Sequence, residues 1–198
     1  LYEDSLLMAE LTMGGQNAAY GTDFLLGNVS GLSYAAKSNG FVFAGYGIED
    51  DNYSDYVNLD VKGKAVIICL GEPKVGDNDI VSGTDKRSKW TNPGISDKVA
   101  LAVAKGATNV ILISPNQPSF SERSVSKSKK TRMYYPSKDD ANGVASTYIS
   151  HDFAKKILGE KADALIAISR KKEVYAIADH FQNNEAVNFS FKKDRITT

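Results

Sequence analysis

The feature that most constrains this chain is an unbroken apolar run from Ala65 to Leu70. Lys62-Gly63-Lys64 precedes the run, and Gly71 and Pro73 close it. A short apolar run between turn signals is typical of a central strand, because both faces of such a strand are buried. The sequence therefore predicts a sheet whose middle is formed by this segment.

A second apolar segment, Phe41 to Ile48, precedes the run and contains the letters Gly-Tyr-Gly. In an extended chain its alternate residues are apolar on both faces, so a second buried strand is expected there. Ser96 is expected to cap a helix that ends near Gly106, and Asn109 to Ile113 is then a buried strand. Strand, helix and strand in this order predict a parallel crossover.

Further elements are predicted along the rest of the chain. Leu6 to Met13 is expected as an edge strand, and Val187 to Phe191 shows the clearest alternation of apolar and polar residues. The remaining predictions are a short strand at Tyr20 to Leu26, a polar loop at Lys74 to Pro93 anchored by Trp90, a long polar loop at about 114–145, a strand at Ser146 to Ile149, a helix from Ser150 to Gly159 and a helix from Ala162 to Lys172.

The segments Val-Phe-Ala-Gly-Tyr-Gly-Ile and Asp-Tyr-x-x-Leu-Asp-Val-Lys-Gly-Lys-x-Val, within Phe41 to Pro73, carry a family resemblance. Together they resemble the protease-associated (PA) domain, in the version that is inserted in secreted di-zinc aminopeptidases. The resemblance implies one α/β domain of the swivelling β/β/α type over residues 1–198. The expected architecture is a β-rich, partly closed barrel or sandwich with two or three flanking helices.

Composition excludes several classes of protein. The 198 residues have a formal net charge of zero, which argues against bulk affinity for nucleic acid. No run of 18 apolar residues occurs, so no membrane span is expected. Leu1 to Asp4 has neither a basic region nor an apolar signal core, so no export signal is expected at this end.

The donors for metal or nucleophilic chemistry are few. Cys69, His151 and His180 are the nitrogen and sulfur donors, and neither the His-x-Asp motif nor the Glu-Glu pair of di-zinc aminopeptidases occurs. Cys69 lies in the apolar run, so a buried, inert thiol is expected. Both histidines are expected to be exposed polar residues near helix ends. No catalytic, cofactor-binding or metal-binding residue is therefore nominated.

Three further patterns each allow a functional and a purely structural interpretation. The acidic loop Glu49 to Asp55 offers oxygen ligands for calcium but lacks the glycine and terminal glutamate of an EF-hand loop. The basic run from Arg123 to Arg132 offers a polyanion site, but no aromatic platform alternates with its charges, so a solvated loop is favoured. Three glycosylation acceptor patterns, at Asn28, Asn52 and Asn188, matter only in a eukaryotic secretory pathway.

The resemblance implies a non-catalytic accessory domain of a secreted zinc aminopeptidase or metallopeptidase. Such a domain restricts substrate access or stabilises the catalytic domain. Its expected partners are the catalytic peptidase domain of the same polypeptide and a peptide or protein substrate. No cofactor is expected in this chain, zinc is expected in the parent catalytic domain, and the expected location is extracellular or periplasmic. One alternative is a free-standing module that binds peptide or glycan, and another is a small hydrolase, which would need a constellation of residues not seen here.

Overall fold

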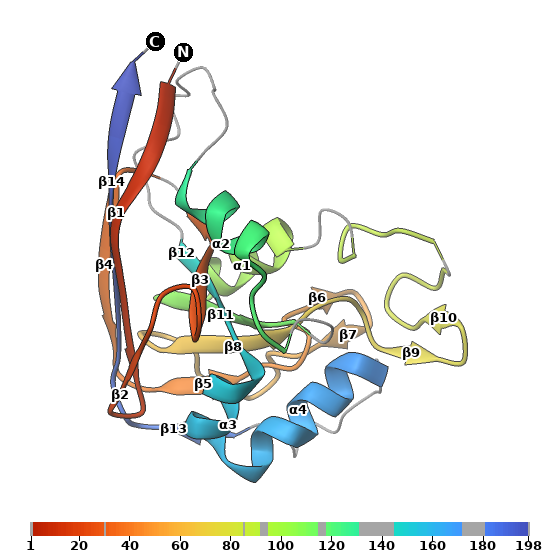
Figure 1. The fold of residues 1–198 in the computed structure, drawn as a ribbon. Coiled ribbons are helices and arrows are strands. Elements are labelled where there is room, and N and C mark those ends of the chain that lie inside the picture. Colours follow the sequence, from red (N-terminus) through yellow and green to blue (C-terminus); the bar gives the residue numbers. More distant parts are fainter. Residues whose placement is uncertain are drawn as a thin grey trace.

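The computed structural model describes residues 2–29, 31–84, 86–91, 95–114, 118–130, 145–171 and 181–197. Within these ranges the chain forms a six-stranded sheet, a four-stranded sheet and two small hairpins. Four helices pack around the sheets in the same ranges (Figure 1). No helix in this part of the chain is long and apolar enough to cross a membrane.

The six-stranded sheet has the strand order β13-β5-β8-β11-β12-β3. Its inner strands β5, β8, β11 and β12 are parallel, and the outer strands β3 and β13 run antiparallel to their neighbours. In chain order the strands are β3 (Phe24–Val29), β5 (Phe41–Phe43), β8 (Ala65–Cys69), β11 (Asn109–Ile113), β12 (Ala145–Ile149) and β13 (Gln182–Asn183). The predicted central strand is thus confirmed, as is the parallel crossover from β8 through helix α1 to β11.

The four-stranded sheet is antiparallel and has the order β2-β1-β14-β4. Its strands are β1 (Tyr2–Met13), β2 (Gln16–Ala18), β4 (Ser33–Ser38) and β14 (Val187–Thr197). β1 and β14 form a long ribbon in which Tyr2 lies opposite Thr197, so the two chain ends lie side by side (Figure 1). The predicted alternation in β14 is confirmed, since Val187, Phe189 and Phe191 are buried.

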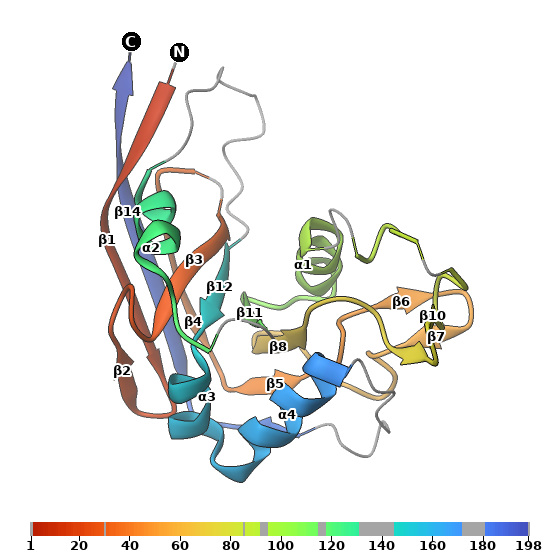
Figure 2. The ribbon, with the colours of Figure 1, turned by 45° about the vertical axis from the view of Figure 1, so that its right-hand side comes forward.

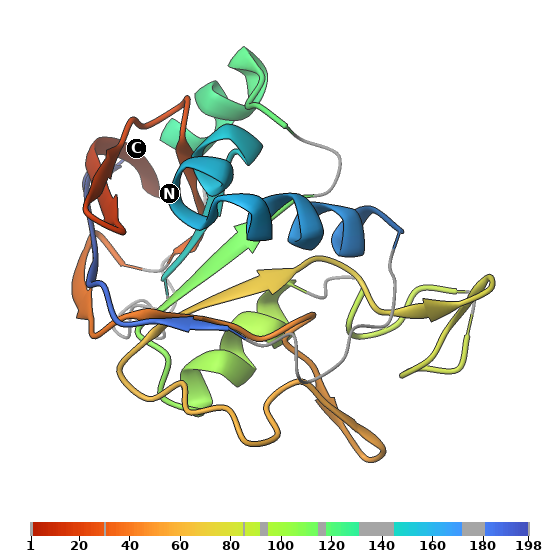
Figure 3. The same ribbon diagram turned by 90° about the horizontal axis from the view of Figure 1, so that it is seen from below.

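The six-stranded sheet is covered on both faces. Ala65, Ile67 and Cys69 of β8 face a core shared with the four-stranded sheet and with helices α3 (His151–Leu158) and α4 (Glu160–Lys171). Val66 and Ile68 face the opposite side, where helix α1 (Ile95–Ala104) packs. Figure 3 shows this sheet between α3 and α4 on one side and α1 on the other. Burial on both faces explains why β8 reads as a continuous apolar run.

Two small hairpins lie beyond the carboxyl ends of β5 and β8, at the end of the molecule opposite the four-stranded sheet (Figures 1 and 2). One is formed by β6 (Glu49–Asp50) and β7 (Tyr53–Ser54), and the other by β9 (Lys74–Val75) and β10 (Asn78–Asp79). Because loops at the carboxyl ends of parallel strands carry ligands in many α/β proteins, this edge is the first place to look for a site.

Several predictions of detail were wrong. The sheets do not close into the expected barrel, since no described strand joins the two main sheets by pairing, and the arrangement agrees instead with the alternative of an α/β sandwich. The described residues form four helices, where two or three were expected. In β1 a bulge between Leu6 and Met8 inserts Leu7, which shifts the alternation and leaves Leu7 61% exposed instead of on the buried face. β2 also pairs with the end of β1, so β1 is an edge strand only in part.

Other elements end or begin elsewhere than expected. β5 stops at Phe43, because Gly45 and Gly47 adopt positive φ and turn the chain. Ser96 lies inside α1 instead of capping it. Helix α2 (Glu122–Lys129), capped by Ser121, lies within the predicted loop 114–145, of which residues 115–117 and 131–144 fall outside the described ranges. The predicted caps Ser150 and Gly159 of α3 are confirmed.

Candidate functional site

Asp55 organises the turn that follows β5. Its buried carboxylate accepts hydrogen bonds from the backbone N–H groups of Tyr46, at 3.1 Å, and Ile48, at 2.8 Å, and from the Tyr53 hydroxyl, at 2.7 Å. Burial, followed by the negative charge of Asp55, raises the pKa of Tyr53 far above its ordinary value, so Tyr53 remains a hydrogen-bond donor. The residues Gly45-Tyr46-Gly47 therefore form a turn that is held by the Asp55 carboxylate.

Gly47 shows how closely this turn packs against the sheet. Its φ is +66°, and a Cβ atom at this position would lie 2.8 Å from Cγ2 of Ile68 on β8. The Cys69 N–H also donates to the Gly45 carbonyl at 2.7 Å, which joins the turn to the end of β8. Only glycine fits a position that combines positive φ with such a contact.

Lys98 of α1 is buried beneath the same edge, with 1% of its surface exposed. Its Nζ donates to the carbonyl oxygens of Gly71 and Cys69, and it lies 5.7 Å from the centre of the Tyr46 ring. A buried ammonium group needs such partners, because its transfer from water is otherwise very costly. Lys98 thus fixes the chain where it leaves β8.

Glu72 and Asp79 hold the second loop, between β8 and α1. The buried carboxylate of Glu72 accepts hydrogen bonds from the Ser82 N–H at 3.0 Å and from the Ser88 hydroxyl. Asp79 is also buried and forms an ion pair of 3.2 Å with Lys74. These contacts order a segment that the sequence predicted only as a polar loop.

Asp50 joins the two loops. Its carboxylate accepts from the Trp90 indole N–H at 2.9 Å and pairs with Lys89 at 3.0 Å. The Trp90 hydrogen bond, followed by the Asp51 N–H and then Lys89, lowers the pKa of the Asp50 carboxyl to about 2. Trp90 is buried, which confirms its predicted role as the anchor of its loop.

The acidic loop Glu49 to Asp55 is thus engaged within the molecule. Besides the contacts of Asp50 and Asp55, Glu49 pairs with Lys105 of the segment after α1. Within the described ranges, no group of three or more His, Cys, Asp or Glu side chains is arranged to hold a metal ion. The loop's acidity serves the packing of neighbouring segments, and the calcium hypothesis gains no geometric support.

The candidate nucleophile and the first histidine are both buried. Burial raises the pKa of the Cys69 thiol to about 12, so the thiolate that nucleophilic chemistry requires is scarce at neutral pH. His151 begins α3 with 6% of its surface exposed, and its Nε2 lies 2.7 Å from the Ser114 carbonyl oxygen. The expectation of an exposed His151 is therefore wrong, since a carbonyl from a distant segment gives the imidazole a buried partner. His180 lies outside the described residues.

The other sequence candidates are dispersed. Asn28, Asn52 and Asn188 are exposed, on β3, at the β6–β7 hairpin and on β14, although Ser30 of the first pattern lies outside the described ranges. Arg123, Lys127 and Lys129 lie on α2, and Lys130 pairs with Glu3 of β1 at 3.6 Å, while Arg132 is not described. Neither set converges with the carboxyl-edge loops on one site.

No protein-family model matches the chain, and no curated protein sequence matches it. Among solved structures, the psychrophilic subtilisin-like protease Apa1 from the Antarctic psychrotroph Pseudoalteromonas sp. AS-11 matches with 15% sequence identity and a TM-score of 0.38. The match covers 93% of this chain and 33% of that one, so the chain spans about a third of the length of this protease.

Proposed function

We propose that this chain is a non-catalytic accessory domain of a secreted zinc aminopeptidase or related metallopeptidase. In this proposal it stands outside the cell or in the periplasm, beside the catalytic domain of the same polypeptide. Its role is to restrict which peptides reach the zinc site or to stabilise the catalytic domain.

The observation that carries the proposal is the use of the buried charges at the carboxyl edge. Asp55, Glu72 and Lys98 all hold backbone groups of the two loops, and Asp50 ties one loop to the other. Side chains used in this way give a surface a fixed shape, whereas chemistry needs a reacting group that points into open space. Two ordered loops on a rigid sheet suit a wall that acts by sterics and hydrogen bonding.

The ribbon of β1 and β14 also supports the proposal. Because Tyr2 and Thr197 are paired, a host chain can enter and leave the domain at one place, which is the arrangement that an inserted domain requires. The hairpins that carry Asp50 and Asp79 lie at the opposite end of the molecule (Figure 2). The domain thus offers one end for attachment and another for contact.

The proposed zinc belongs to the catalytic domain of the parent. The described residues of this chain contain no suitable ligand group, and Cys69 and His151 are both buried in contact with backbone carbonyl groups. We therefore derive no catalytic step through this chain. In the parent, zinc would supply an activated water for peptide hydrolysis.

The test is deletion of the domain from the parent enzyme, with a short linker joining the segments that flank Tyr2 and Thr197. Turnover of a small aminoacyl reporter should be largely retained, while turnover of peptides of ten or so residues should change several-fold, since a wall acts through access and positioning. Zinc content and thermal unfolding of the deletion variant establish that the catalytic domain is folded.

Two results would go against the proposal. Equal loss of both activities in a folded, zinc-loaded variant would remove the gating role and leave only a structural one. Zinc-dependent peptidase activity from residues 1–198 alone would overturn the accessory-domain assignment.

A further inference from the structure

β4 is the outermost strand on one side of the four-stranded sheet. It pairs with β14 along its whole length, from Ser33 opposite Lys192 to Ser38 opposite Val187, and its register has no bulge. Within the part of the chain that the structure describes, no strand pairs with its other edge. Ser33, Ala35 and Lys37 are exposed. A regular, unpaired edge of this kind is a template for another strand.

The register determines which backbone groups face this free edge. The Lys193 N–H donates to the Leu32 carbonyl at 2.7 Å, so Leu32 and Lys193 form a hydrogen-bonded pair. Hydrogen-bonded and non-bonded pairs alternate along antiparallel strands, so Tyr34, Ala36 and Ser38 bond to β14. The N–H and C=O groups of the three alternate residues, Ser33, Ala35 and Lys37, therefore point away from the sheet.

Asn39, the next residue in this alternation, shows that the backbone of another segment can bond to the outer edge of β4. The N–H of Asn39 points the same way as that of Lys37, and it donates to the Gly63 carbonyl at 2.8 Å. A carbonyl from another segment thus already occupies the line that an added strand would follow. The three positions before it remain open to a partner outside the described residues.

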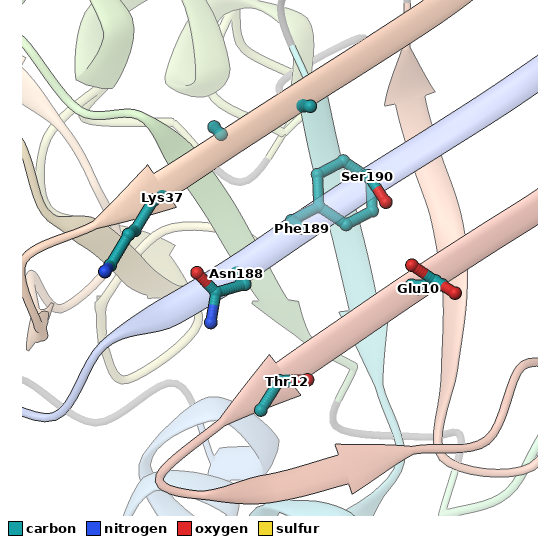
Figure 4. A pocket seen from close by; sticks show the side chains of 8 residues that line it. Glu10, Thr12, Lys37, Asn188, Phe189 and Ser190 are labelled. Atoms are coloured by element: carbon teal, nitrogen blue, oxygen red, sulfur yellow. The ribbon is translucent and has the colours of Figure 1, made fainter.

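The outer face of the sheet beside this edge carries a shallow hollow of about 350 Å³. Figure 4 shows Lys37, Asn188 and Thr12, and then Ser190 and Glu10, on three neighbouring strands around it. Ala35 leaves space near the edge, and no described carboxylate pairs with Lys37, which is the only basic residue among residues 1–60. Glu10 lies on β1, two strands away from the edge.

We propose that the free edge of β4 binds an extended peptide as an added antiparallel strand, with an acidic residue of the peptide opposite Lys37. Backbone groups of Ser33, Ala35 and Lys37 would supply the hydrogen bonds, and the hollow beside Ala35 would take the side chain that faces it. Peptide residues directly opposite these three positions share the outer face, which brings the acid next to the Lys37 ammonium. The inference rests on the four-stranded sheet and holds whether or not the chain belongs to a peptidase.

The experiment uses two seven-residue peptides of alternating Thr and Val, one with Glu and one with Lys at the centre, added to the ¹⁵N-labelled chain. The Glu peptide should slow hydrogen exchange at the amides of Ser33, Ala35 and Lys37, while Tyr34 and Ala36 are protected before it is added. At low salt the Lys peptide should bind about fivefold more weakly, as expected for exposed charge pairs.

Two variants test the geometry separately. Ala35→Pro removes an N–H that β14 does not use, so it should abolish peptide binding while the thermal midpoint stays close to that of the parent chain. Lys37→Glu should reverse the preference from the Glu peptide to the Lys peptide. It tests the proposal independently if Ala35→Pro fails to fold. Glu10→Gln is the matched control, and it should leave the affinities for the Glu and Lys peptides within twofold of those of the parent chain.

The proposal fails if millimolar Glu peptide leaves the Ser33, Ala35 and Lys37 amides unchanged. It also fails if Lys37→Glu keeps the original preference. A lysine on an edge strand also serves to prevent pairing between copies. If the same three amides become protected by dimerisation of the chain without peptide, a second copy occupies the edge and the peptide proposal is overturned.

Discussion

Asp55 is the residue whose loss should affect the carboxyl-edge loops most. It accepts two backbone hydrogen bonds and one from Tyr53, all within a buried turn. Asp55→Ala should destabilise the chain by about 3 kcal/mol, because hydrogen bonds to a charged group contribute about 1.5–3 kcal/mol and the donors would be left unpaired. Urea unfolding measures the change. Asp51→Ala, at an exposed position of the same loop, should stay within about 0.5 kcal/mol of the parent chain.

Asp50 provides a residue-scale prediction that depends on pH. Its folded pKa, about 2, lies below its ordinary value of 3.8, so its contribution to stability is present above about pH 4 and is lost as the pH falls through 2. Trp90 is the only tryptophan, so its fluorescence reports on this contact. An NMR titration should place the pKa of the Asp50 carboxyl near 2. Trp90→Phe should raise this pKa more than Lys89→Ala does. The opposite order would show that the ion pair with Lys89, and not the indole hydrogen bond, dominates.

The sequence could not identify the residues that matter in these loops. Asp55 is one of several acids in a short stretch, and only the fold shows that it is buried while Asp51 is exposed. His151 was expected to be exposed because its buried partner, the Ser114 carbonyl, comes from a segment 37 residues away. By contrast Cys69 lay in an apolar run that predicted its burial directly, and the structure confirms this.

At the scale of elements, the turn after β5 depends closely on its sequence at Gly47. Gly47→Ala should destabilise the chain by more than about 1 kcal/mol, because positive φ is strained for alanine and the new methyl would meet Ile68. Gly76→Ala is the matched control, since Gly76 has a similar φ of +63° with nothing within 4 Å of an added Cβ. The difference between the two variants in chemical denaturation measures the cost of the contact. Equal losses would mean that backbone strain alone explains the glycine.

Elements with a strong pattern were predictable, and those without one were not. β8 and β11 were found because both of their faces are buried, and β14 because one face is buried and the other is exposed. α2 was missed because it has no buried residue: apart from Val125, its eight residues are serines and charged residues, so it shows no apolar stripe. The bulge at Leu7 was also missed, since an inserted residue in β1 becomes visible only when the register with β14 is known.

At the scale of the whole molecule, we expect the apolar core to be stable without a metal ion. The core includes residues from both main sheets and from α3 and α4, and a second cluster lies under α1. A strong chelator should therefore leave the thermal unfolding midpoint of this chain within about 1 °C, a shift that corresponds to only a few tenths of a kcal/mol. A drop of several degrees would show that a metal ion contributes to folding.

The ribbon of β1 and β14 has a mechanical consequence. Its two ends leave the domain at the same place, and the backbone hydrogen bonds between antiparallel strands run across the ribbon. A force that separates Tyr2 from Thr197 therefore loads these bonds one pair after another, starting at the ends, and not all at once. We expect the outer part of the ribbon, up to the bulge at Leu7, to open before the two cores beneath it unfold, with the ion pair of Asp4 and Arg195 as the main contact to break. Tension applied at the two ends would therefore open the ribbon first, before it acts on the rest of the domain.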